Sequence, residues 1–231
     1  FKIETFGEDK EAAKKYGDLY IPENLYIVGT VNMDETTFPF SKKVLDRANT
    51  IEFNEVNLNI NFEYFDTIVE DIKGLKMNNS YISSKYLKVI DCINKREEIE
   101  KIISILNEIN YELEKINHHF GYRVRDEVIF YVLYAIEDEL MNMDEALDHA
   151  IRQKILPRIQ GSNISIKEVL INLYKLFSND FSSDLDVYDN SVSERILEYI
   201  KANKVKYPFS IKKVYRMIRR FDLDGFTTFW E

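Results

Sequence analysis

The chain has 231 residues, of which 45% are hydrophobic and 31% are charged, a composition typical of a globular protein and not of a disordered one. Its formal net charge of -9 argues against a surface that is basic throughout and binds DNA or an anionic membrane. Cys92 is the only cysteine, which excludes an internal disulfide and a cysteine-based zinc site. No apolar run approaches the roughly 20 residues of a membrane helix, so we expect a cytoplasmic protein.

Residues 24–56 predict a strand, a loop, a short helix and a second strand. The run at 25–31 is apolar and β-branched, which favours a strand buried on both faces of a parallel sheet. Residues 32–37 are polar and form the expected loop. Pro39 opens a short helical stretch that ends near Arg47, and the alternation at 50–56 indicates the second strand.

The pattern becomes helical from about residue 60. Apolar residues at spacings of three and four predict a long amphipathic helix at about 97–117. Capping-box spacing at Ser165 and again at Ser191 predicts that helices begin there. Residues 179–190 are rich in Ser and Asp and are expected to form a loop. The other expected helices cover 128–140, 144–156 and 209–221.

The predicted fold class is therefore an α/β fragment followed by a mainly helical body. Two strands do not make a stable parallel sheet alone. Either further strands precede this stretch in a longer protein, or a partner orders the first part of the chain. We expect the division between α/β and helical parts near residue 57, giving domains at 1–57 and 58–231.

Four segments in order resemble one family, the McrB-like AAA+ proteins, which are motor subunits of modification-dependent restriction systems. Residues 21–37 read IPENLYIVGTVNMDETT and residues 38–53 read FPFSKKVLDRANTIEF, similar to the sensor-1 strand, the following helix and the next strand of that family. Three shorter segments resemble its lid and C-terminal end, namely FGYRVRDE at 120–127, KILPRIQG at 154–161 and GFTTFW at 225–230. The resemblance implies that residues 1–57 hold the last strands of the AAA+ parallel sheet and residues 58–231 the helical lid.

The resemblance also implies a set of site residues. Asn32 matches the sensor-1 position, whose amide contacts the attacking water or the γ-phosphate. Arg47 matches the arginine finger, a cation that reaches the neighbouring subunit's nucleotide. Arg123 and Arg125 are both candidates for the sensor-2 cation of the lid. The family pattern Asn-Thr-Ala-Asp departs here to Asn32-Met33-Asp34-Glu35, so Asp34 or Glu35 takes the place of an acid that could bear on base preference.

The resemblance further implies the nucleotide and the partners. The Gly-rich phosphate-binding loop is absent from this sequence, so this stretch alone is not expected to hydrolyse nucleotide. GTP or ATP with Mg²⁺ would be bound mainly by other regions of a longer protein. A finger acting on a neighbour requires head-to-tail contact, so the expected assembly is a homo-oligomeric ring, hexameric by family. A McrC-type nuclease subunit is the expected partner, with DNA bound indirectly through another domain and no membrane contact.

Simpler roles for the same residues stay open. Asn32 can satisfy backbone groups in a turn, and Arg47 can complement the dipole at a helix end. Arg123 and Arg125 can pair with Asp126 or Glu127. The adjacent His118 and His119 diverge on a helix and are not expected to share a metal ion, so no metal site is predicted. A basic helical face is expected on residues Lys212, Lys213, Arg216, Arg219 and Arg220, for solvation or docking of an acidic partner.

Two other functions compete with the motor. The chain could be a non-catalytic module that keeps an AAA+-derived fold for assembly, or part of a MoxR-type chaperone ATPase, which shares the sensor layout. Nucleotide binding separates the first alternative from the motor. The neighbouring gene separates the second, because a nuclease favours restriction and a metal-dependent adhesion protein favours the chaperone.

Overall fold

The computed structural model describes residues 11, 21–22, 24–33, 37–54, 76, 78–178 and 184–230. The chain forms two compact units. We call the first the N-terminal unit, which consists of Phe1–Asn32 and Asn57–Lys85, and the second the helical unit, which consists of Met33–Val56 and Tyr86–Glu231. Residues Met33–Val56 therefore belong with the helices, and the AAA+ subdomain boundary at residue 57 stays a prediction.

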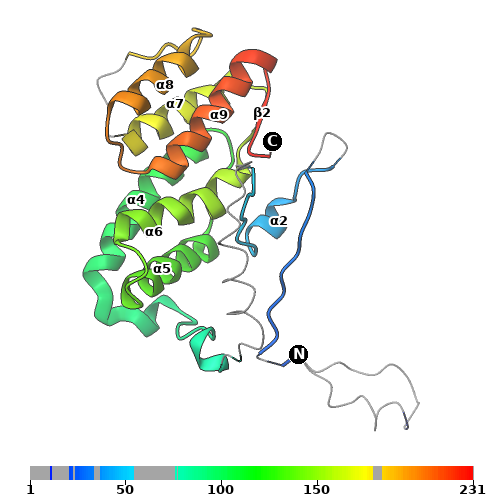
Figure 1. Cartoon of the computed structure of the whole chain (residues 1–231), viewed down its shortest axis with the longest axis vertical. Helices are drawn as coiled ribbons and strands as arrows, with labels where there is room; N and C mark the ends of the chain where they lie inside the picture. Colours follow the sequence, from blue (N-terminus) through cyan, green and yellow to red (C-terminus); the bar gives the residue numbers. More distant parts are fainter. Residues whose placement is uncertain are drawn as a thin grey trace, which may run out of the picture. The chain divides into compact units, whose positions relative to one another are not determined.

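Helix α4, Arg96–Glu114, is the first long helix of the helical unit (Figure 1). It follows the short helix η2, Val89–Lys95, which contains the buried Cys92. The apolar stripe predicted for 97–117 is confirmed, because the side chains at the expected spacing are buried. They are Ile99, Ile102, Leu106, Ile109 and Leu113.

Helix α5, Tyr122–Glu137, packs against both α4 and α6, Met143–Ala150. It begins six residues before the predicted start at Val128, so Arg123 and Arg125 lie inside its first turns. Asn142 caps α6, since its Oδ1 accepts from the Glu145 amide at 3.0 Å and the Glu145 carboxylate accepts from the Asn142 amide at 3.1 Å.

The predicted helix at 144–156 has a break in its regular winding. After α6 the chain continues as a π-helical turn, η3, Ile151–Ile155, and then as a 3₁₀ turn, η4, Leu156–Arg158. Pro157 lies in η4, where its missing amide hydrogen prevents the chain from continuing as a regular α-helix. We call residues 151–158 the KILPR turn, after the sequence of their last five residues. Such π-turns wind the backbone more widely and are frequent at functional positions.

The C-terminal half adds three helices: α7, Ile164–Ser178, α8, Val192–Ala202, and α9, Pro208–Asp224, which packs on both of the others (Figure 1). The helices predicted here are confirmed, but the capping boxes are not. Asn163 Oδ1 accepts from the Ser165 amide at 3.0 Å, so Asn163 caps α7. Ser191 makes no cap hydrogen bond for α8 and instead donates to Asp189.

Two short strands close the helical unit. Strands β1, Gln160–Gly161, and β2, Thr227–Thr228, pair in antiparallel register with Gly161 opposite Thr227. Gly225 ends α9 in the left-handed conformation, at a φ of 67°, which glycine adopts without steric cost. This sheet was not predicted, because each strand has only two residues.

The strands predicted at 25–31 and 50–56 are not formed in the described residues. Ile27 and Val28 are 86% and 89% exposed, so the first segment is not buried on both faces. The short helix predicted before Arg47 is present as α2, Lys42–Leu45, with Leu45 buried and Val44 exposed. Residues 55–56, Asp34 and Glu35 lie outside the described residues. The placement of 25–56 in a AAA+ parallel sheet stays a prediction.

Within the described part of the chain, none of the helices combines the length and the apolar character that crossing a membrane requires.

Candidate functional site

The segment that carries Arg47 belongs to the helical unit, and its alternate residues face the helices and the solvent. We call residues 42–54 the docked segment. Its residues Asp46, Ala48 and Thr50 bond with the KILPR turn, and Glu52 bonds with α9. Its odd-numbered positions Arg47, Asn49, Ile51 and Phe53 are exposed. Asp46 and Arg47 form a turn after α2, and from Thr50 onward the alternation matches the twofold period of an extended chain. The two large apolar side chains, Ile51 and Phe53, lie outward.

The residues on both sides of Arg47 are held by the KILPR turn. The Arg158 guanidinium forms an ion pair and hydrogen bond with Asp46. The Lys154 ammonium donates to the Ala48 carbonyl at 3.0 Å. Both basic side chains are only 3% exposed. Because a buried cation without a partner is costly, these contacts hold residues 46 and 48 closely.

Further along the docked segment, Thr50 and Glu52 continue these attachments. The Thr50 amide and hydroxyl both donate to the Gln153 carbonyl, at 3.2 and 2.8 Å. Glu52 Oε1 accepts from the Lys213 ammonium at 2.7 Å, and Arg152 lies 3.7 Å from Oε2. The side chains of Glu52 and Lys213 are 6% and 2% exposed. The segment is therefore anchored at four consecutive even-numbered residues.

A half-buried histidine lies at the other end of the docked segment. Lys42 donates to the Asn117 carbonyl at 2.7 Å, directly before His118. Burial lowers the pKa of His118, and the positive charges of Lys42 and Arg158 lower it further. Its Nδ1 is buried and has no hydrogen-bond partner among the described residues. Burial and the two neighbouring cations therefore both favour the neutral form of His118.

The structure places the two main predicted residues in different units. Arg47 is exposed at the end of α2, and its Nη1 donates to the Lys43 carbonyl at 2.8 Å. This bond to a carbonyl of α2 is the simpler role considered for Arg47. Asn32 is exposed and belongs to the N-terminal unit, where Tyr26 donates to Asn79 Oδ1 at 2.7 Å. Both assignments stay predictions.

The two sensor-2 candidates differ in their surroundings. Arg125 forms an ion pair with Asp126 at 2.6 Å, and its guanidinium lies 4.9 Å from the ring centre of Tyr122. Arg123 is exposed and makes no ion pair or hydrogen bond with any residue that the structure describes. Both lie in α5, so their position in the chain does not separate the two candidates. Arg123 is the better candidate for contact with an external anion.

The predicted basic face of α9 is divided by burial. Lys212 and Arg219 are exposed, whereas Lys213 turns inward to Glu52. Arg220 donates to the Trp230 carbonyl at 2.8 Å and so helps to hold the C-terminal residues on α9. The prediction of a basic helical face that includes all five residues was therefore wrong. Within the described ranges, no three His, Cys, Asp or Glu side chains gather as a metal site would require.

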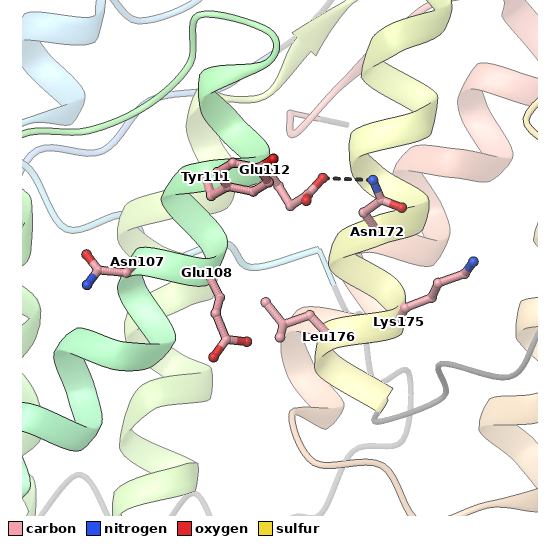
Figure 2. Close-up of a pocket in the computed structure, with 7 residues that line it drawn as sticks. All are labelled: Asn107, Glu108, Tyr111, Glu112, Asn172, Lys175 and Leu176. Carbon is pink, nitrogen blue, oxygen red and sulfur yellow. Dashed lines mark hydrogen bonds between the residues drawn. The ribbon is translucent and has the colours of Figure 1, made fainter.

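A groove of about 610 Å³ lies between α4 and α7 (Figure 2). Its lining consists of Asn107, Glu108, Tyr111, Glu112, Asn172, Lys175 and Leu176. Asn172 on α7 donates to Glu112 on α4 at 2.7 Å, and Lys115 donates to the same carboxylate at 2.7 Å. The Glu112 carboxylate is thus already neutralised within the helical unit. None of the predicted site residues lines this groove.

Sequence reasoning missed the residues that hold Arg47 in place. Lys154 and Arg158 were noted only as part of a segment resembling the AAA+ lid, and the partners Asp46 and Glu52 were not noted at all. A signal was present, because KILPRI places two cations in an otherwise apolar run. Charged residues in such a run are buried only with partners, but the sequence does not show which partners.

A mostly helical domain with a charged attachment site for an extended segment is therefore the class that the fold and the contacts define. The chain belongs to the family described as "Domain of unknown function (DUF8727)", whose model matches residues 68–226. That range begins after the segment that carries Asn32 and Arg47. No curated protein matches the chain, and no solved structure matches it.

Proposed function

We propose that this chain is the C-terminal part of an McrB-like AAA+ nucleoside-triphosphatase, a ring motor that drives a partner nuclease in a restriction complex. One observation supports the proposal best. The docked segment presents Arg47 outward while the groups on either side of it are bound to the KILPR turn. A finger that serves a neighbouring subunit needs this combination of exposure and fixed position, because its contribution to the rate depends on geometry.

The outward side chains of the docked segment support the same reading. Ile51 is 67% exposed and Phe53 is 90% exposed, although fully burying each side chain would contribute about 1.5–3 kcal/mol. Their backbone amides make no hydrogen bond to the described residues. An extended segment with open backbone groups and exposed apolar side chains is suited to pairing in a larger sheet. The AAA+ α/β subdomain is the sheet that we propose for it.

The remaining site residues take roles by the same resemblance. Asn32 would contact the attacking water or the γ-phosphate, and Arg123, rather than the paired Arg125, would be the sensor-2 cation. GTP or ATP with Mg²⁺ would be held mainly by regions outside these residues. A McrC-type nuclease would be the partner, and DNA would be selected by a different domain.

The test is hydrolysis by the full-length protein that carries this sequence. GTP and ATP turnover is measured on the assembled protein and on the variants Arg47→Ala and Arg219→Ala. Arg219 is an exposed arginine on α9 and serves as the matched control. We expect Arg47→Ala to lower kcat about 10³-fold or more, as loss of a finger does, with Arg219→Ala close to the unmodified protein.

Mixing Arg47→Ala subunits with Asn32→Ala subunits separates action in trans from action in cis. A finger that serves the neighbour allows mixed rings to regain part of the turnover, because some sites then receive both intact residues. Unchanged turnover in Arg47→Ala refutes the finger. Absence of any GTP or ATP binding by the full-length protein would instead support the non-catalytic assembly module.

A further inference from the structure

Lys154 occupies a central place among the buried charges of the helical unit. Its ammonium forms an ion pair with Glu127 on α5 and donates to the carbonyl of Ala48 on the docked segment. The side chain is 3% exposed, so bulk water does not replace either partner. One buried cation thus links α5 directly to the residue that follows Arg47.

Arg158 makes the matching contact on the other side of Arg47. It is also 3% exposed, whereas its partner Asp46 is 38% exposed. The Nε of Arg158 is buried and has no partner among the described residues. Its binding to the protein therefore depends on Asp46, and losing that carboxylate would leave an uncompensated buried charge.

The two contacts together restrict the backbone at Arg47. The peptide groups of residues 46–48 lie between two anchored points that both belong to the KILPR turn. Arg47 has a long, rotamer-rich side chain, and its own bond to Lys43 lies on the exposed surface, where such a bond contributes little. The backbone at residues 46–48 therefore sets the point and direction from which the Arg47 side chain extends.

We propose that Lys154 and Arg158 are positioning residues that fix Arg47 relative to α5, and that Lys154 transmits displacements of α5 to Arg47. The inference rests on the proposed function. Because α5 carries Arg123 and Arg125, a shift of this helix on contact with a subunit's own nucleotide would move the finger that serves the adjacent subunit. The KILPR turn then couples neighbouring sites in the ring.

The first experiment measures, without reference to hydrolysis, how firmly Lys154 and Arg158 hold residues 46–48. We call this arrangement the clamp. Amide hydrogen exchange is recorded on the full-length protein and on Arg158→Met, Asp46→Asn and Lys154→Met. The reporter amides are those of Ala48 and Thr50, which donate to Val44 and Gln153. We expect exchange at both to rise about tenfold or more, which corresponds to local opening of the segment, while α4 amides stay protected.

Two controls separate local release from general destabilisation. Arg158→Lys keeps a cation opposite Asp46 and should restore most of the protection. Arg96→Met removes an ion pair with Glu100 whose side chains are 77% and 60% exposed, and it should leave Ala48 and Thr50 unchanged. If Arg158→Met does not fold, Asp46→Asn tests the same contact from its exposed partner.

The second experiment measures nucleotide turnover on the same variants. A displaced finger should lower kcat about 10²-fold, the effect of a misplacement of roughly 1 Å, and leave KM nearly unchanged. Lys154→Met should also lower the Hill coefficient of hydrolysis toward one, because it breaks the link between α5 and Arg47.

The outcomes distinguish this inference from the function on which it rests. If Arg47→Ala leaves turnover intact, the motor proposal fails whatever the exchange data show. If Ala48 and Thr50 stay protected in Arg158→Met, Asp46→Asn and Lys154→Met, the clamp is overturned even in an active motor. A third outcome also refutes the positioning role. In it, exchange rises and Arg47→Ala is inactive, but Arg158→Met, Asp46→Asn and Lys154→Met keep full turnover and cooperativity.

Discussion

Replacing Glu52 by Ala should strongly destabilise the helical unit. The Glu52 carboxylate accepts from the Lys213 ammonium at 2.7 Å, and the two side chains are 6% and 2% exposed. Lys213 also lies 4.4 Å from the ring centre of Phe229, which does not replace a carboxylate. The variant therefore removes the Glu52 carboxylate from beside a buried cation, with Arg152 as a second cation nearby.

The expected loss follows from this burial. Removing one partner of a buried ion pair costs about 3–5 kcal/mol, a large part of the roughly 5–15 kcal/mol that stabilises a typical domain. For a domain of this size each kcal/mol lowers Tm by about 2–4 °C, so Glu52→Ala should lower Tm by about 6–20 °C. Replacing both partners, as Glu52→Leu with Lys213→Met, should cost far less because no charge stays buried.

Circular dichroism during urea and thermal unfolding measures these differences. Arg96→Ala, which breaks the exposed pair with Glu100, is the control and should change stability by less than about 1 kcal/mol. The reasoning is refuted if Glu52→Ala matches this control. It is equally refuted if the double variant loses as much stability as the sum of the losses of Glu52→Leu alone and Lys213→Met alone.

Two further predictions concern backbone conformation and pH. Gly161 has a φ of 137°, and an added Cβ would lie 2.6 Å from Ile166 Cδ1, whereas Gly225 has a φ of 67° with nothing within 4 Å. Gly161→Ala should therefore lower the free energy of unfolding more than Gly225→Ala does. The cost of Gly225→Ala should be only the left-handed strain, about 1–2 kcal/mol. Equal losses of stability in urea unfolding would contradict this. Burial lowers the pKa of His118, with help from nearby cations, so the folded protein binds protons less readily than the unfolded chain. Its contribution to stability is complete above the unfolded pKa of about 6.5 and is lost as pH falls through the lower folded value. His118→Gln should reduce this acid destabilisation in thermal melts, and an unchanged pH profile would exclude the role.

The helical body was predictable because its determinants are local. In α4 the apolar residues from Ile99 to Leu113 recur at helical spacing, and burying this stripe needs no knowledge of distant sequence. The end of the helical pattern at Pro157 follows from the missing amide hydrogen. The exact helix starts were less predictable, since Asn163 competes successfully with Ser165 for the cap of α7.

The attachment of Arg47 was decided by tertiary structure alone. Asp46 and Arg158 are 112 residues apart, and Glu52 and Lys213 are 161 apart. Alternation at 50–56 indicated an extended segment, but not that its polar side would face the helices. That orientation depends on buried cations brought together by the KILPR turn and α9, because a buried charge selects its partner by proximity in space, which the order of residues along the chain does not specify.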